Sequence, residues 1–263
     1  MTPQDLGVLP LHGLSHVRGP AQPPLSVRTM PGLLRETVAR FGDREAVVFR
    51  EQGVRWTWRQ FSAEVDRLAA GLLALGLRRG ERLGIWSPNR VEWLVTQFAT
   101  ARIGVILVNI NPSYRLSELE YALQLSGCRA VVAAERLRTA DYLAMLQTVA
   151  PKLPALEFII RMGDGDTAGM LRYADVLAAP EAVDVAALDT IEATLGCHDP
   201  INIQFTSGTT GHPKGATLTH HNVVNNAIAV AAAMRFTEAD KLCIPVPLYH
   251  CFGMVLAVLA CVS

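Results

Sequence analysis

The chain has 263 residues, of which 50% are apolar, and its 24 basic side chains balance 24 acidic ones. This apolar fraction supports a sizeable core, so the composition predicts one large folded domain or two small ones and excludes a disordered chain. Zero net charge excludes a general basic field, so no nucleic-acid partner is expected and any anion site must be local. The longest apolar run, residues 253–262, is about half of the roughly 20 residues that cross a bilayer, so no integral membrane segment is expected.

The cysteines are odd in number and never stand in Cys-x-x-Cys spacing; they are Cys128, Cys197, Cys243, Cys251 and Cys261. This pattern favours reduced thiols over a disulfide framework, and it lacks zinc-ligand spacing, so we expect no metal site. Residues 1–20 contain an early Asp5 and no continuous apolar stretch, unlike a secretory signal peptide. These features together predict a cytoplasmic protein.

A proline-rich lead, residues 1–29, precedes a regular alternation of predicted strands and helices. Short apolar runs bounded by turn residues predict strands at residues 46–50, 54–58, 82–86, 105–110, 130–133 and 157–160. Apolar residues recurring at three and four positions predict helices at residues 33–41, 61–75, 88–103, 117–126 and 140–149. This alternation predicts an α/β fold, with repeated strand-helix units forming largely parallel sheets covered by helices.

Polar residues and prolines mark the expected helix starts. Thr57 and Gln60 have the spacing of a capping box before the helix at residues 61–75. Ser87 followed by Pro88 matches an N-cap with proline at the first helical position, so the next helix is expected to begin there.

Residues 162–194 have a weaker pattern with several glycines and predict a surface excursion before the sheet resumes at residue 201. A soft boundary there gives three expected parts: the lead at 1–29, a first α/β subdomain at 30–195 and the start of a second α/β subdomain at 196–263. Residues 253–263 predict an apolar helix without a polar face or capping glycine. We therefore expect the chain to be the front part of a longer protein, truncated at its C-terminus.

A glycine-rich stretch from Thr206 to Gly215, TSGTTGHPKG, is the most informative part of the sequence. Its glycines let backbone N–H groups converge, its hydroxyls add donors, and Lys214 supplies a charge that can neutralise phosphate oxygens. The stretch is not a Walker A loop, because Pro213 stands where that motif needs a glycine. The residues alone leave a phosphate cradle and a surface turn with a solvated lysine equally open.

The flanks of this stretch predict a hairpin. An alternating apolar strand at residues 201–205 leads into it, residues 216–218 predict a second strand, and a helix is expected to begin near Asn222. His220 and His221 precede that helix and indicate a polar helix start.

His250 follows a predicted strand at residues 243–246 and precedes the apolar helix at residues 253–263. Ligands bind at such strand ends in α/β sheets, whereas an ordinary core or surface histidine has the same sequence context. The GDGDTA stretch from Gly163 fits a loose dinucleotide motif, but its aspartates would repel a pyrophosphate. It half-matches a calcium loop, but Ala168 occupies a ligand position. An exposed acidic turn is expected there.

The stretch TSGTTGHPKGATLTHHN, residues 206–222, resembles the phosphate-loop signature of the adenylate-forming enzymes, which include acyl-CoA synthetases, peptide-synthetase adenylation domains and luciferases. PLYHCFG at residues 247–253 resembles the next family motif, and RIG at 102–104 with NINP at 109–112 resembles an earlier one. Further stretches, at 111–128 and 198–205, resemble the medium-chain fatty acyl-CoA synthetase branch. The resemblance implies that the fold is the incomplete N-terminal domain of an adenylate-forming enzyme.

The resemblance further implies an ATP-dependent acid-thiol ligase. In that reaction a carboxylate attacks the α-phosphate of ATP to give an acyl-adenylate and pyrophosphate, and the thiol of coenzyme A then displaces AMP. The implied small-molecule partners are a fatty acid, ATP and coenzyme A, with Mg²⁺ accompanying ATP. The implied phosphate-binding residues are Thr206, Ser207, Gly208, Thr209, Thr210, Gly211 and Lys214. The implied catalytic residues are Lys214 and His250, with His250 where the acyl group meets the α-phosphate.

Later family motifs for adenine, ribose and magnesium, and the small C-terminal domain with its adenylation lysine, are absent from the sequence. We therefore expect the ligands of Mg²⁺ and coenzyme A to lie outside this chain, and the chain alone to bind ATP weakly and make no acyl-CoA. The alternative functions are a non-catalytic nucleotide- or acyl-binding module and a small membrane-associated protein. The sequence carries no signal for the oligomeric state.

Overall fold

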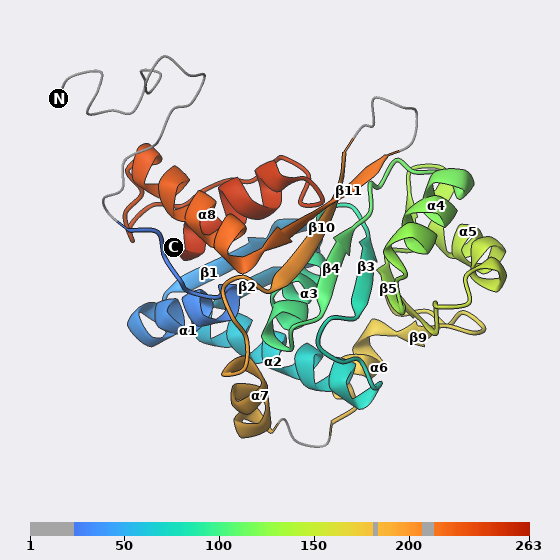
Figure 1. Cartoon of the computed structure of the whole chain (residues 1–263), viewed down its shortest axis with the longest axis horizontal. Helices are drawn as coiled ribbons and strands as arrows, with labels where there is room; N and C mark the ends of the chain where they lie inside the picture. Colours follow the sequence, from blue (N-terminus) through green and yellow to red (C-terminus); the bar gives the residue numbers. More distant parts are fainter. Residues whose placement is uncertain (1–23, 181–183, 207–212) are drawn as a thin grey trace, which may run out of the picture.

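The computed structural model describes residues 24–180, 184–206 and 213–263, and a seven-stranded sheet lies at its centre (Figure 1). The strand order is β11-β10-β4-β3-β5-β8-β9, and every neighbouring pair is parallel except β10 and β11. The strands are β3 Arg82–Trp86, β4 Ile106–Asn109, β5 Ala130–Ala133, β8 Phe158–Arg161, β9 Leu171–Arg172, β10 Pro200–Thr206 and β11 Lys214–Thr219. The predicted α/β class with a largely parallel sheet is confirmed.

Helices cover this sheet, and smaller elements lie around it. The α-helices are α1 Met30–Phe41, α2 Trp58–Ala74, α3 Val91–Arg102, α4 Leu116–Ser126, α5 Tyr142–Val149, α6 Tyr173–Ala178, α7 Val185–Glu192, α8 His220–Met234 and α9 Ala260–Val262. Two separate hairpins pair β1 Glu45–Phe49 with β2 Val54–Thr57, and β6 Arg136–Leu137 with β7 Ala140–Asp141. Single 3₁₀ turns at Arg50–Gln52 and Ala150–Lys152 and a π-helix at Phe252–Leu259 complete the fold. Within the described ranges no helix has the length and apolarity to span a membrane.

The direction of the connections reverses beside β3. α3 links β3 to its neighbour β4 on one side, whereas α4 and α5 carry the chain back to β5 and β8 on the other side. Right-handed crossovers then place α4 and α5 on the face opposite α3, and Figure 1 shows α4 and α5 on one side of the sheet and α2 and α3 on the other. Ligands bind outside the carboxyl ends of parallel strands at such a reversal, so the topology marks the edge where β3 and β4 end.

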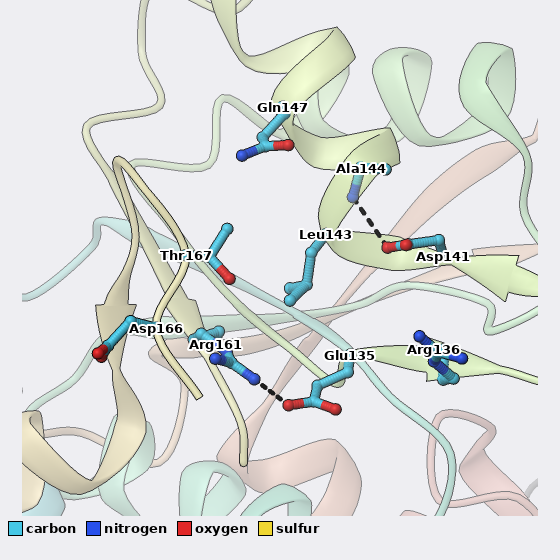
Figure 2. A pocket seen from close by; sticks show the side chains of 9 residues that line it. All are labelled: Glu135, Arg136, Asp141, Leu143, Ala144, Gln147, Arg161, Asp166 and Thr167. Atoms are coloured by element: carbon cyan, nitrogen blue, oxygen red, sulfur yellow. Dashed lines mark hydrogen bonds and ion pairs between the residues drawn. The ribbon is translucent and has the colours of Figure 1, made fainter. Parts of the chain in front are cut away.

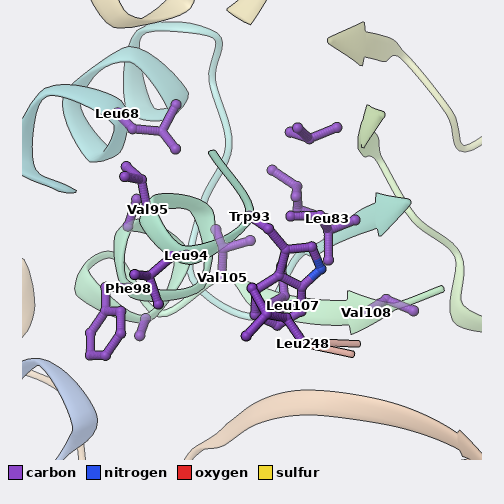
Figure 3. Packing of buried hydrophobic residues seen from close by; sticks show 14 of the residues in the cluster. Leu68, Leu83, Trp93, Leu94, Val95, Phe98, Val105, Leu107, Val108 and Leu248 are labelled. Carbon is purple, nitrogen blue, oxygen red and sulfur yellow. The ribbon is translucent and has the colours of Figure 1, made fainter. Parts of the chain in front are cut away.

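The core is centred on α3, which is buried on almost every face. Trp93 and Phe98 have no exposed surface, and the Phe98 ring meets Phe61 of α2 edge to face at 5.3 Å. Figure 3 shows these α3 side chains against apolar residues of β3 and β4, with Leu248 joining the cluster from the C-terminal part of the chain. A helix without a polar face must be buried on all sides, so α3 packs between the sheet and α2 and determines where α2 lies.

A buried arginine, Arg102, is the last residue of α3 and forms ion pairs with neighbouring helices. The Arg102 guanidinium pairs with Asp66 of α2 at 3.0 Å, with Asp189 of α7 at 2.6 Å and with Glu192 of α7. Arg35 of α1 also reaches Glu192, at 2.6 Å. These contacts join four helices, and removal of the arginine would leave a buried carboxylate without its main partner.

Arg102→Ala is therefore expected to lower the free energy of unfolding by about 3 kcal/mol, as measured by urea denaturation. Arg28→Ala is the matched control, because Arg28 and Glu36 form a pair whose side chains are 48% and 53% exposed. That exposed pair is expected to contribute less than about 1 kcal/mol. Equal losses in the two variants would contradict a special role for the buried cluster.

Some helix boundaries follow the local signals and others do not. Thr57 and Gln60 form the predicted capping box at the start of α2, with Thr57 Oγ1 accepting from the Gln60 N–H at 3.2 Å. The predicted start of α3 at Ser87 is wrong, because the helix begins at Val91. There the Gln52 side chain, from the turn between β1 and β2, accepts the Val91 N–H at 2.8 Å. A cap supplied 39 residues upstream has no local sequence signal.

Two longer stretches also differ from expectation. Residues 162–194 were expected to be a surface excursion, but they contain β9, α6 and α7. Residues 243–246 were expected to form a strand, but they are described and belong to no strand. Pro245 lies within this segment and Pro247 follows it directly, and both lack the N–H donor that a sheet ladder needs.

Candidate functional site

The carboxyl ends of β3, β4 and β10 meet at one edge of the sheet, and the described site candidates Thr206, Lys214 and His250 lie near it. In the parallel register Asn109 of β4 lies beside Ile85 of β3 and Gln204 of β10. The chain leaves this edge at Ser87 after β3 and at Thr206 after β10. Short parallel strands in register thus bring together residues more than a hundred positions apart in sequence.

The described ends of the glycine-rich stretch face each other across a hairpin. Thr206 ends β10 and pairs with Lys214, the first residue of β11, and both residues are exposed. Tyr121 of α4 donates its hydroxyl to the Pro213 carbonyl at 3.2 Å, which connects the start of β11 to the helix layer. Lys214 is exposed, and no carboxylate of the described residues forms an ion pair with it.

The predicted hairpin is confirmed by β10 and β11, and the predicted helix follows directly as α8. The five inner residues of the phosphate prediction, Ser207, Gly208, Thr209, Thr210 and Gly211, lie outside the described residues. Their role stays a prediction.

His250 lies on an exposed turn between residue 247 and the π-helix. Its ring nitrogen Nδ1 accepts the Phe252 N–H at 3.1 Å, so the neutral ring carries its proton on Nε2. The Tyr249 ring stands edge-on to the imidazole, with centroids 6.4 Å apart and planes at 88°. His250 thus presents an N–H donor to solvent, and its orientation is set by its own backbone.

The loop after β4 is held by two stacked aromatic rings. Trp86 and Tyr142 stack at 3.7 Å with planes 14° apart. Trp86 Nε1 donates to the Asn111 carbonyl at 3.0 Å, and the Tyr142 hydroxyl donates to the Pro112 carbonyl. Burial raises the pKa of Tyr142 to about 12, which keeps its hydroxyl protonated as a donor. The loop at the carboxyl edge is therefore rigidly supported.

A hollow of about 320 Å³ lies at the carboxyl ends of β5 and β8 (Figure 2). It is lined by Glu135, Arg136, Asp141, Leu143, Ala144, Gln147, Arg161, Asp166 and Thr167. Figure 2 shows the buried Arg161 side chain directed at Glu135, with which it forms an ion pair. Among the described site candidates, Thr206, Lys214 and His250 do not line this hollow.

The GDGDTA turn is exposed at Asp164 and Asp166, and Arg172 lies 3.6 Å from Asp166. Across residues 24–180, 184–206 and 213–263, no group of three His, Cys, Asp or Glu side chains could hold a metal ion. The five cysteines are all free thiols.

Sequence reasoning missed the environment of His220. The residue was expected at a polar helix start, but it is fully buried, and its Nδ1 accepts the Met30 N–H at 3.1 Å. Burial lowers the pKa of His220 to about 4, against a smaller opposing effect of Asp199. Protonation of Nδ1 would destroy the bond to Met30, so the ring is neutral in the folded chain.

The pKa of His220 has a consequence for stability. Because the folded pKa, about 4, is lower than the unfolded value near 6.5, the neutral ring stabilises the fold above pH 6.5, and this contribution is lost as the pH falls toward 4. The loss amounts to about 3 kcal/mol at most. His220→Asn keeps an acceptor for Met30 without a titratable group, so its unfolding free energy should fall less between pH 7 and pH 4.5. Urea denaturation at both pH values tests this, with His221→Asn as the control, and identical losses in wild type and His220→Asn would contradict it.

The chain belongs to the AMP-binding enzyme family, whose model matches residues 34–263. It is 43% identical over 262 residues to the mitochondrial medium-chain acyl-CoA ligase ACSF2 of Danio rerio, covering 94% of this chain and 43% of that protein. The ACSF2 of Homo sapiens is 40% identical over 270 residues, covering 96% of this chain and 44% of that protein. The structure of Mycobacterium smegmatis MbtA superposes with a TM-score of 0.78 at 29% identity, covering 90% of this chain and 42% of that one. The expected family is confirmed, and the chain spans less than half the length of these relatives.

The expected cytoplasmic location is wrong by the same comparison, since both vertebrate relatives are named as mitochondrial enzymes. Free cysteines indicate a reducing environment, but they do not distinguish one reducing compartment from another. The cysteine pattern therefore could not distinguish the cytoplasm from a mitochondrial compartment.

Proposed function

We propose that this chain supplies the phosphate-binding hairpin and the His250 turn of an ATP-dependent fatty acyl-CoA ligase. In this reaction a fatty-acid carboxylate and ATP give an acyl-adenylate and pyrophosphate, and coenzyme A then takes the acyl group as a thioester. The observation that carries the proposal is the position of Thr206 and Lys214, which pair where β10 ends and β11 begins. The His250 turn is bonded to the same edge of the sheet through Asn109. Membership of the AMP-binding family and the relatives' printed names support the choice of reaction.

The hairpin fits a polyphosphate in its chemistry. Nucleotidyl transfer depends on positioning and charge neutralisation, and the exposed ammonium of Lys214 would supply the charge. Hydroxyl and backbone N–H donors complete the proposed phosphate site, whose residues are Thr206, Ser207, Gly208, Thr209, Thr210, Gly211 and Lys214. The antiparallel pairing of β10 and β11 places the two ends of this set, Thr206 and Lys214, opposite each other.

His250 is proposed to act at the junction of the acyl and phosphate groups. Its Nε2–H is an exposed donor, and hydrogen bonds aimed at oxygens that gain charge in the transition state lower the barrier. We propose that it donates to the carboxylate or α-phosphate oxygen, with Tyr249 restricting the tilt of its ring.

The remaining assignments are also proposals. Mg²⁺ would enter with ATP, and the protein ligands of Mg²⁺ and coenzyme A are proposed to come from other parts of the enzyme. The division into segments at 30–195 and 196–263 stays a prediction. β10 and β11, from the second segment, extend the same sheet as β3 and β4 of the first.

Lys214→Ala in the complete ligase is expected to slow fatty-acid-dependent exchange of pyrophosphate into ATP by more than tenfold, because the phosphate charge loses its counter-ion. Lys241→Ala is the control, since Lys241 is an exposed lysine that pairs with Glu45 at 3.2 Å and belongs to no proposed site. An unchanged rate in Lys214→Ala would refute the phosphate role of this lysine.

The 263-residue chain alone is expected to release no pyrophosphate in the presence of ATP, Mg²⁺ and a medium-chain fatty acid. A colourimetric pyrophosphate assay, with the complete ligase as positive control, measures this. Release by the chain alone would overturn the expectation. ATP binding by the chain together with an inactive complete protein would instead support the alternative, a non-catalytic nucleotide- or acyl-binding module.

A further inference from the structure

The turn that carries His250 belongs to no strand, yet its backbone is fixed to the sheet by side chains. Asn89, in the loop after β3, donates Nδ2 to the Val246 carbonyl at 2.9 Å and accepts the Leu248 N–H on Oδ1 at 2.8 Å. One amide group therefore brackets Pro247 on both sides. Its geometry matches that of a neighbouring strand, so it replaces the ladder bonds that this segment lacks.

Asn109, the last residue of β4, holds the next residue of the turn. Its Nδ2 donates to the Tyr249 carbonyl at 2.9 Å, and its Oδ1 accepts from Asn202 Nδ2, also at 2.9 Å. Asn202 in turn donates to the Leu107 carbonyl at 2.9 Å. Asn109 and Asn202 are each 1% exposed, so their amides cannot exchange these partners for water without a cost.

Two buried side chains, Leu248 and Met254, also hold this turn against the sheet. Leu248, 3% exposed, inserts into the core beside α3, as Figure 3 shows. Met254, 1% exposed, lies against the amides of Asn109 and Gln204, with its sulfur 3.4 Å and 3.5 Å from their nitrogens. The backbone from 246 to 254 thus has fixed points on both sides of His250.

We infer that Asn89 and Asn109 are positioning residues that hold the His250 imidazole at the carboxyl edge of the sheet. The inference rests on the proposed function, because it assigns the asparagines to the geometry of that site. A single neutral hydrogen bond contributes little to global stability, whereas a misplacement of about 1 Å at a reacting centre can cost about a hundredfold in rate. Loss of the Asn89 bracket should therefore impair adenylation far more than folding.

Asn89→Ala in the complete ligase tests this, with Asn225→Ala as the matched control. Asn225 makes the same type of double bond to a distant backbone, accepting the Ser26 N–H at 2.7 Å and donating to the Ser26 carbonyl at 2.9 Å, but it lies on α8. We expect Asn89→Ala to lower kcat for acyl-adenylate formation at least tenfold with a change in the KM for ATP below threefold. Asn225→Ala should change kcat less than twofold.

A double-mutant cycle separates positioning through His250 from general damage. In a His250→Ala background, Asn89→Ala should lower kcat by less than threefold, because the group it positions is already gone. A full tenfold loss in that background, or equal losses in Asn89→Ala and Asn225→Ala, would overturn the inference while leaving the proposed function intact. Asn89→Asp retains the acceptor for Leu248 and should lose less activity than Asn89→Ala.

A readout without activity keeps the test independent of the reaction. In the wild-type 263-residue chain the Leu248 amide should be protected from hydrogen exchange, and Asn89→Ala should reduce that protection at least tenfold with little change at core amides such as Leu83. Unchanged Leu248 exchange would overturn the inference. A complete wild-type ligase that forms no acyl-adenylate would overturn the proposed function, and the Leu248 result would still decide whether the bracket exists.

Discussion

The buried amide of Asn109 is the interaction on which the arrangement of the site depends. It stands at the end of a central strand, receives a hydrogen bond from the next strand through Asn202 and gives one to the Tyr249 carbonyl. Buried polar groups need partners, so each of these segments is placed where the amide can be satisfied. Strand pairing, the His250 turn and the hairpin at Thr206 are therefore parts of one geometry.

Topology explains why these segments meet at this edge. The chain leaves β3 toward one face and leaves β4 and β5 toward the other, so the loops after the strands diverge and expose their ends. Burial of α3 on nearly every face fixes the helices behind that edge, and the Arg102 cluster joins α7 to them. The same architecture occurs in a solved member of this fold at a TM-score of 0.78.

Local patterns predicted the central strands well and the site contacts poorly. Residues 82–86 and 130–133 match β3 and β5, because strands buried on both faces are apolar runs with sharp ends. The resemblance pointed to Lys214 and His250, but no sequence pattern shows that Asn89 donates to the Val246 carbonyl from 157 positions away. The predicted strand at 243–246 is wrong, because Pro245 and Pro247 lack the N–H donors of a sheet ladder and the Asn89 side chain holds the segment instead.

The crystal structure of the complete ligase with a sulfamoyl mimic of an acyl-adenylate is the most direct measurement. The account predicts the sulfamoyl group within hydrogen-bonding distance of His250 Nε2, at the carboxyl edge of β4 and β10. A mimic bound elsewhere, for example in the hollow beside Arg161, with no contact to His250 or Lys214, would contradict it.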